Sequence, residues 1–216
     1  MQFNRHMLER VLSSKIVLEA LDYVRRVMEN YRPGHGFDHV LRVLGLGFRI
    51  ASMVKNSVDF EVLALASIFH DVGRVFEERK KIHHAIISAR IAREFLESRG
   101  YPKSKIEAVI NAILSHSFSL GFKPRSIEGK ILSDADKLDA IGAIGIARCF
   151  MDSAYRGRSI KDSVKHFYNK LLNLKDLLYT EPARRIAERR HRFLIRFLEE
   201  LKQDLSECEI KCFQSV

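Results

Sequence analysis

The sequence predicts an all-α protein. Apolar residues recur every three or four positions along most of the chain, which is the period of an amphipathic helix. No segment alternates apolar and polar residues over a length convincing for a strand, and there is no internal repeat. Only 4 prolines and 11 glycines interrupt the 216 residues. We therefore expect one compact domain over residues 1–216, with a helical core at about 13–155 and C-terminal helices at about 160–207 packed on it.

Capping residues and chain breaks divide the first half of the chain into five expected helices. Short polar side chains that can accept hydrogen bonds from free helix amides mark four of the N-termini, at Ser13–Ser14, Asp38, Asp59 and Ser104. Glycine, proline or asparagine interrupts the apolar pattern at 31–37, 56–57 and 100–102. The expected helices span about 13–30, 39–53, 59–71, 83–99 and 104–116. The charged stretch 74–81 is expected to be a loop or lid, and 117–124 a second loop.

The second half of the chain is expected to contain three longer helices. Asp134 caps or opens the first of them, which contains small residues at close spacing and so allows a neighbouring helix to pack tightly. Pro182 favours the first turn of a helix and begins a long last one. The three helices span about 135–155, 160–178 and 182–207. The expected fold is thus a helical bundle with a long C-terminal helix.

Charge and cysteine content limit the class of protein. The net charge of +10 suits phosphate-bearing partners such as nucleotides, nucleic acid or a membrane surface, although solubility alone also explains it. The three cysteines, Cys149, Cys208 and Cys212, form no CxxC pair and are expected to be reduced thiols. No signal-peptide core is present, and no apolar run approaches the roughly 18 residues of a membrane span. We expect a cytoplasmic protein without a membrane segment; an oligomer is compatible with the sequence.

Histidines and aspartates near the ends of the expected helices indicate a metal site. His70 and Asp71 directly follow the apolar run 62–69, and imidazole nitrogen and carboxylate oxygen both ligate divalent ions. Neighbours on a helix point about 100° apart, so further ligands must come from other helices. His39 and Asp136 occupy comparable positions elsewhere and complete a set of two nitrogens and two carboxylates. For the His-Asp pair alone, a buried histidine bonded to its neighbour is the simpler alternative.

Four segments containing these residues resemble a known family. They are Gly34–Val43 (GHGFDHVLRV), His70–Arg74 (HDVGR), His116–Ser119 (HSFS) and Asp134–Arg148 (DADKLDAIGAIGIAR). Together they resemble the HD superfamily of metal-dependent phosphohydrolases, and more closely its small YpgQ/YedJ-type hydrolases. The resemblance covers nearly the whole chain. It implies an HD-domain helical bundle and one divalent ion (Mn, Mg, Co, Ni, Fe or Zn) held by His39, His70, Asp71 and Asp136.

The resemblance also implies roles for single residues. Asp71 would orient or deprotonate a metal-bound water, and Lys137 would offset charge on the phosphoryl group. The candidates for substrate contacts are His35, Arg74, His84, His116, Asp134 and Lys170. Three of these residues have an alternative to a direct role: an exposed loop position for His35, a helix cap or a partner of a ligand for Asp134, and a solvated charge for Lys137.

The implied function is hydrolysis of a phosphate bond in a nucleotide or a related phosphate ester. Triphosphates losing pyrophosphate and monophosphates losing phosphate both fit. A non-catalytic HD protein that binds nucleotide or nucleic acid is the alternative, and the presence of all four ligands favours the enzyme. The arginine run Arg184–Arg192 is expected to be a solvated face that is not needed for chemistry on a small substrate, with a nucleic-acid or oligomer contact as the alternative.

Overall fold

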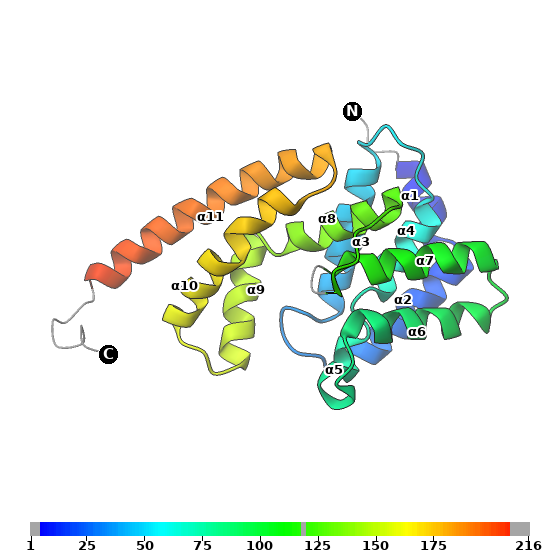
Figure 1. Cartoon of the computed structure of the whole chain (residues 1–216), viewed down its shortest axis with the longest axis horizontal. Helices are drawn as coiled ribbons and strands as arrows, with labels where there is room; N and C mark the ends of the chain where they lie inside the picture. Colours follow the sequence, from blue (N-terminus) through cyan, green and yellow to red (C-terminus); the bar gives the residue numbers. More distant parts are fainter. Residues whose placement is uncertain (1–4, 118–119, 208–216) are drawn as a thin grey trace.

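The computed structural model describes residues 5–117 and 120–207, and within them the chain is helical, with no strand. The first helices are α1 (Arg5–Leu12), α2 (Lys15–Met28), α3 (Phe37–Ala51), α4 (Phe60–Phe69), α5 (Arg74–Lys80) and α6 (His84–Glu97). They are followed by α7 (Lys103–His116), α8 (Ile127–Asp139), α9 (Gly142–Tyr155), α10 (Ile160–Asn169), the 3₁₀ helix η2 (Leu171–Leu177) and α11 (Glu181–Glu207) (Figure 1). The predicted all-α class and the long C-terminal helix are confirmed.

Helix α4 is the centre of the bundle, because every residue from Val62 to Phe69 is buried. Asp59 caps it as predicted, accepting hydrogen bonds of 3.1 Å from the amides of Glu61 and Val62. Helices α2, α3, α7 and α8 all pack against it. A helix that is apolar around its whole circumference needs such neighbours on every side. Its C-terminal end, where His70 and Asp71 follow, therefore lies inside the molecule.

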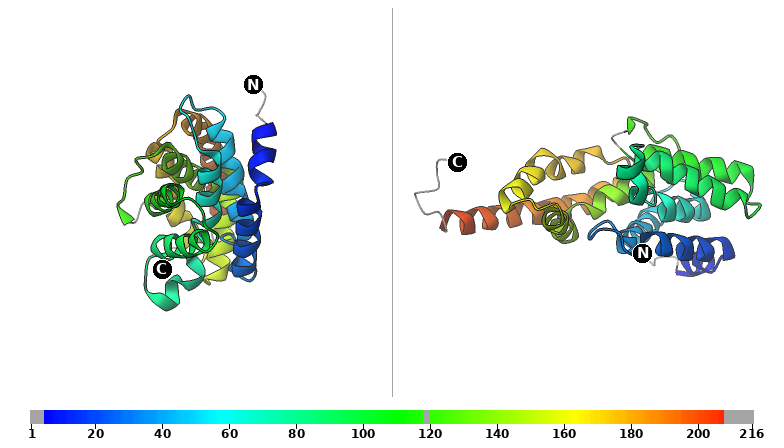
Figure 2. Two further views of the ribbon diagram at one scale, coloured as in Figure 1. Left: turned by 90° about the vertical axis from the view of Figure 1, so that its right-hand side faces the viewer. Right: turned by 90° about the horizontal axis from the view of Figure 1, so that it is seen from below.

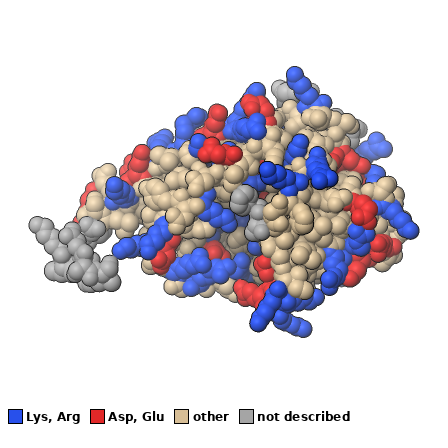
Figure 3. Space-filling view, viewed as in Figure 1, with Lys and Arg blue, Asp and Glu red and all other residues tan. Residues whose placement is uncertain are grey.

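Helices α9, α10, η2 and α11 lie beside this bundle, and α11 extends beyond it toward the C-terminus (Figures 1 and 2; space-filling view in Figure 3). Buried side chains of α10 and α11, including Phe167, Leu194 and Leu198, belong to the same apolar core as those of α2, α3, α4, α6, α7 and α8. This continuity supports the expectation of one domain. No helix in the described ranges is long and apolar enough to span a membrane.

The charged stretch 74–81, expected to be a loop or lid, is instead helical as α5. It contains neither proline nor glycine, and Arg, Glu and Lys are all good helix formers, so its charge did not indicate a loop. The helix ends at Lys81, whose φ of 51° is left-handed and whose amide bonds to the carbonyl of Glu77.

The single helix expected at 135–155 is wrong, because two helices, α8 and α9, occupy this part of the chain. Gly142 has a φ of +76°, and a Cβ on Gly145 would lie 2.3 Å from the carbonyl oxygen of Ala140. The chain therefore turns sharply against itself where the pattern had indicated continuity. Asp134, expected to cap this helix, lies in the interior of α8.

Two smaller expectations also differ from the structure. The helix expected at 160–178 divides into α10 and η2 at Lys170, whose φ of −133° leaves the helical region. Ser14 holds the N-cap position of α2 as expected but makes no side-chain cap bond. Asp38 and Ser104 lie within α3 and α7, where a glycine and a proline hold the N-cap positions.

Several expectations concern residues that the structure covers only in part. Cys149 is a free, buried thiol, as expected. Cys208 and Cys212 lie outside the described residues, as do positions 118–119 of the expected loop at 117–124.

Candidate metal centre

His39, His70, Asp71 and Asp136 meet at one point in the interior. His39 comes from the first turn of α3, His70 and Asp71 follow α4, and Asp136 belongs to α8. Nε2 of His39 lies 3.2 Å from Nε2 of His70, 3.5 Å from Oδ2 of Asp71 and 3.4 Å from Oδ1 of Asp136. The structure thus brings together all four side chains that the sequence indicated as ligands.

The outer ring nitrogens fix the tautomers of the two histidines. Nδ1 of His70 lies 2.7 Å from the carbonyl oxygen of Ser67, and Nδ1 of His39 lies 2.8 Å from Oδ2 of Asp139. Carbonyl and carboxylate oxygens only accept, so each Nδ1 carries the hydrogen and donates. In the neutral rings, both Nε2 lone pairs then face each other beside two carboxylates. Such a converging set of buried acceptors fits a divalent cation.

The raised pKa of His39 also indicates that this site attracts positive charge. Burial and the Arg148 guanidinium lower the pKa of His39, but the three neighbouring aspartates outweigh them and raise it to about 9. Burial lowers the pKa of His70 to about 4, so that ring is neutral near pH 7. In the protein alone, a proton on His39 balances part of the negative charge. A divalent ion would take the place of that proton.

A second group of buried acceptors faces the other oxygen of Asp71. Nε2 of His84 and of His116 lie 3.5 and 3.7 Å from Oδ1 of Asp71, and none of these three atoms has a hydrogen-bond partner in the described chain. Their Nδ1 atoms donate to Oε1 of Glu77 at 3.0 Å and to the carbonyl of Ile113 at 2.5 Å. Lone pairs aimed at one another need a cation, a water or a substrate hydroxyl between them.

The turn that presents Asp71 depends on Gly73. A Cβ there would lie 2.3 Å from the carbonyl oxygen of His84 and 2.7 Å from the amide of Ser88, so only glycine lets this turn approach α6. Nε of Arg74 then donates to Oδ2 of Asp71 at 2.5 Å. Burial would raise the pKa of Asp71, but Arg74 and the surrounding imidazoles hold it well below its usual value. Asp71 is therefore an ionised carboxylate.

Asp139 is a buried carboxylate that the sequence pattern did not single out. It accepts 2.8 Å hydrogen bonds from Nδ1 of His39, Nε of Arg42 and Nη1 of Arg148. Burial would raise its pKa, but these partners hold it at about 2. The sequence spacing could have indicated Asp139. It follows the predicted ligand Asp136 by three residues, and Arg42 follows His39 by three, so each pair lies on one helix face. Asp139 therefore holds the His39 ring in place.

Lys137 is a buried amine engaged within α8. Nζ donates to the carbonyl of Ser133 at 3.2 Å and to its hydroxyl at 2.5 Å, and burial lowers its pKa. It also lies 5.3 Å from the centroid of the Tyr179 ring. None of its hydrogen bonds is to one of the four predicted ligands.

Asp134 connects α8 to the segment before α11. Its carboxylate accepts 2.8 Å bonds from the amides of Tyr179 and Thr180 and a 2.7 Å bond from the Thr180 hydroxyl. These three bonds occupy both oxygens. They favour a structural role for Asp134 over the substrate contact considered from the sequence.

Replacing Asp134 by alanine is expected to lower the free energy of unfolding by about 2–4 kcal/mol, because two amides and a hydroxyl lose their acceptor. Thr180→Val removes only the hydroxyl bond and should cost about 1 kcal/mol. Chemical denaturation followed by far-ultraviolet circular dichroism measures both. If the two variants were equally stable, the amide bonds to Asp134 would contribute nothing to holding this segment.

The remaining predicted substrate residues, His35, Arg74 and Lys170, line one cavity of about 350 Å³. The cavity adjoins the metal centre, because Arg74 bonds Asp71 and the ring centroid of His35 lies 6.0 Å from that of His39. Its other basic lining residues are Arg32, Arg148, Arg156, Arg158 and His166, and Asp152 is its acidic member. A pocket of this charge suits phosphate groups.

Sequence comparison identifies the family. Residues 36–141, which contain all four predicted ligands, match the HD domain model. YpgQ of Bacillus subtilis is 35% identical to this chain over 192 residues, which cover 85% of this chain and 90% of YpgQ. The chain therefore belongs to the HD-domain superfamily. Within it, the chain is of the same small type as YpgQ, as the sequence motifs indicated.

Solved structures agree with this assignment. YpgQ in complex with ADP has a TM-score of 0.69 and 32% identity, covering 85% of this chain and 97% of YpgQ. The Lin1889 protein from Listeria innocua has a TM-score of 0.71 and 31% identity, covering 90% of this chain and 98% of its own. A predicted HD superfamily hydrolase from an uncultured Thermotogales bacterium has a TM-score of 0.67 and 32% identity, covering 87% and 91%. The HD-domain helical bundle is thus confirmed.

Proposed function

We propose that this protein is a metal-dependent phosphohydrolase that acts on nucleotides. The observation that carries the proposal is the convergence of two imidazoles and two carboxylates beside a basic cavity. Mixed imidazole and carboxylate sets accept several divalent ions, so Mn, Mg, Co, Ni, Fe and Zn remain candidates. A bound ion would lower the pKa of its water and polarise a phosphoryl oxygen. YpgQ is a relative that has been crystallised with ADP, which supports nucleotides as the substrate class.

Asp71 is the proposed partner of the attacking water. Its Oδ2 is held by Arg74, whereas Oδ1 has no hydrogen-bond partner among the described residues. An ionised carboxylate with one free oxygen can accept a hydrogen bond from water and then its proton. Arg74 fixes the carboxylate orientation while this happens. Because Arg74 lines the basic cavity as well as contacting Asp71, we also assign to it the compensation of phosphoryl charge expected of Lys137.

The proposed role of Lys137 is then indirect. Its amine donates to the Ser133 hydroxyl, which itself donates to the carbonyl oxygen of His116 at 3.1 Å. Through this chain of contacts, Lys137 supports the end of α7 that presents the His116 ring. Its positive charge lies in a buried setting, where electrostatic interactions are stronger than in water.

The basic cavity supplies donors for the substrate phosphates. Nη2 of Arg148 lies 3.1 Å from Nδ1 of His35, and arginine only donates, so the hydrogen of His35 is on Nε2. Burial and Arg148 lower the pKa of His35 to about 3, which keeps the ring neutral. Nε of Arg32 is buried without a hydrogen-bond partner in the described chain, and its nearest acidic atom is Oδ1 of Asp152 at 3.8 Å. With Lys170, these groups can donate to phosphate oxygens.

The test is an assay of phosphate and pyrophosphate release from nucleoside mono-, di- and triphosphates. Protein stripped of metal is supplied with Mn²⁺, Mg²⁺, Co²⁺ or Ni²⁺, and elemental analysis of the purified protein identifies the ion it retains. Pyrophosphate from triphosphates would indicate attack at the α-phosphorus, and phosphate from monophosphates would indicate a nucleotidase. Nucleotide binding without turnover under every condition would instead support the non-catalytic alternative.

Lys170→Ala is expected to raise KM for the nucleotide about 10-fold while kcat stays within about twofold, since a distant phosphate contact contributes equally to ground and transition states. Lys170 is exposed and lines the basic cavity. Lys161→Ala is the matched control, because Lys161 is also exposed on α10 but does not line that cavity. Equal KM values for the two variants would remove Lys170 from the substrate contacts.

A further inference from the structure

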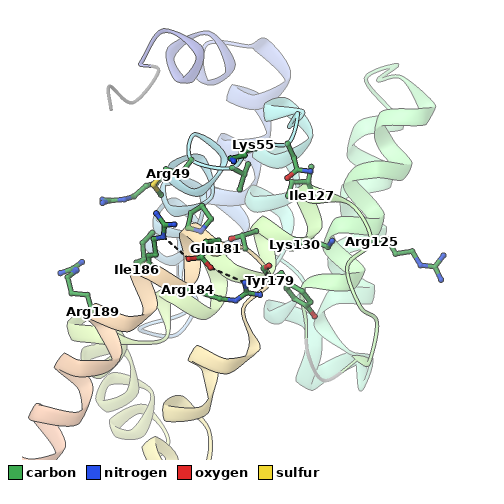
Figure 4. Close-up of a pocket in the computed structure, with 16 residues that line it drawn as sticks. Arg49, Lys55, Arg125, Ile127, Lys130, Tyr179, Glu181, Arg184, Ile186 and Arg189 are labelled. Atoms are coloured by element: carbon green, nitrogen blue, oxygen red, sulfur yellow. Dashed lines mark hydrogen bonds and ion pairs between the residues drawn. The ribbon is translucent and has the colours of Figure 1, made fainter.

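A second and larger basic groove lies between the end of α3, the start of α8 and the start of α11 (Figure 4). Its volume is about 1010 Å³, and none of the four predicted metal ligands lines it. Seven lining residues are basic: Arg49, Lys55, Arg125, Lys130, Arg184, Arg185 and Arg189. Glu181 is the acidic member of the lining. The groove is therefore strongly positive and separate from the proposed catalytic centre.

Most of this positive charge is uncompensated. The carboxylate of Glu181 accepts from Nε of Arg185 at 3.1 Å and lies 3.7 Å from Nη1 of Arg184. Within the described chain, the five other basic residues of the groove have no ion-pair partner. Figure 4 shows the guanidinium groups of Arg125 and Arg189 extending on opposite sides of the groove.

The positive charge continues along α11 beyond this groove. Arg185, Arg189, Arg192 and Arg196 are spaced by four, three and four positions, which places them on one face of the helix. They extend over about 16 Å at the helical rise per residue. Arg189 also lines an adjoining groove of about 420 Å³ together with Arg192, Phe193 and Arg196. A row of charges this long matches an extended polyanion better than a single phosphate group.

Each groove also contains an exposed aromatic ring. Tyr179 in the first is 37% exposed, and Phe193 in the second is 48% exposed. Proteins that bind single-stranded nucleic acid combine a basic track for the backbone with aromatic side chains on which bases stack. An acidic peptide would form ion pairs with the arginines but has no regularly spaced aromatic groups to stack on the two rings. The combination therefore favours nucleic acid.

We propose that these two grooves, joined at Arg189, form a binding surface for single-stranded nucleic acid. This surface is additional to the proposed hydrolysis of nucleotides and uses none of the residues assigned to it. The backbone phosphates would lie along the arginines of α11, and bases would stack on Phe193 and Tyr179.

The test is fluorescence anisotropy with a labelled single-stranded RNA of about 12 nucleotides, within the usual range of site sizes. Binding is measured from about 50 to 200 mM salt, and a gel confirms that the probe stays intact. Arg189→Glu with Arg192→Glu should weaken binding at least about 30-fold and make the salt dependence shallower by about 1.4 in log–log slope, since about 0.7 is lost per phosphate contact. Phe193→Ala should weaken binding about 10-fold and leave the slope unchanged, because stacking releases no counterions.

The matched control is Arg90→Glu with Lys103→Glu. It makes the same charge change at exposed positions of α6 and α7 that line neither groove, and it should bind within about threefold of wild type. Circular dichroism and the thermal midpoint verify that every variant is folded. Three results would overturn the proposal: no binding by wild type, equal losses in the groove and control variants, or competition by ADP as effective as by unlabelled RNA at equal phosphate concentration.

Discussion

Asp71→Ala is expected to lose hydrolysis of nucleotides by a factor of at least about 10³ while keeping its helical structure. Asp71 is the side chain that faces both groups of acceptors, with Oδ2 3.5 Å from Nε2 of His39 and Oδ1 3.5 Å from Nε2 of His84. Alanine removes a proposed metal ligand and the proposed partner of the attacking water together. The bound metal measured by elemental analysis should fall with the activity.

The fold should survive this change, because Asp71 follows α4 and adds no apolar surface to the core. Its partner Arg74 is partly exposed and lies 3.9 Å from Glu77, so it is not left as a buried isolated charge. Circular dichroism and thermal melting check this point, and Asp71→Asn keeps the side-chain volume in case alanine unfolds the turn. Asp204→Ala, at an exposed carboxylate of α11, is the control. Activity above about a tenth of wild type in Asp71→Asn would exclude the carboxylate from the chemistry.

Three of the four proposed ligands, His39, His70 and Asp71, could be indicated from sequence because local patterns place them. The apolar run of α4 is buried on all sides, so whatever follows it is delivered to the interior, and His70 and Asp71 follow it directly. The Asp59 cap fixed where that helix begins. His39 lies in the first turn of α3, where a short glycine-rich segment ends. In each case a few consecutive residues determine the position.

The interactions that could not be predicted join parts of the chain that are distant in sequence. Asp139 and His39 are 100 residues apart, and nothing in either segment alone states that they pair. The break between α8 and α9 depends on how closely Gly145 approaches Ala140. The small residues had indicated close packing between helices, and the tight contact is instead within the turn itself. Small residues in a sequence show that another segment can approach closely, but they do not show which segment of the backbone does so.

The last prediction concerns Asp139, which positions His39 without belonging to the proposed ligand set. Asp139→Asn should weaken binding of the divalent ion about 10- to 100-fold, as is usual when the hydrogen-bond partner of a ligating histidine is lost. The carboxylate of Asp139 accepts hydrogen bonds from His39, Arg42 and Arg148. Asparagine has only one acceptor oxygen, and its amide hydrogens would face at least one of these donors. The His39 ring would then be less firmly oriented. Isothermal titration calorimetry with the divalent ion measures the metal affinity directly.

Rescue by metal separates this positioning role from the role of Asp71. At saturating Mn²⁺, Asp139→Asn should recover most of its activity because all four proposed ligands remain, whereas Asp71→Ala should not recover. Some loss of stability is also expected, since the Arg148 side chain is only 9% exposed and its charge loses a full negative partner. A lower thermal midpoint with unchanged metal affinity would mean that Asp139 supports the fold alone. Metal affinity reduced in parallel with a shift in the metal dependence of turnover would establish that Asp139 acts through His39.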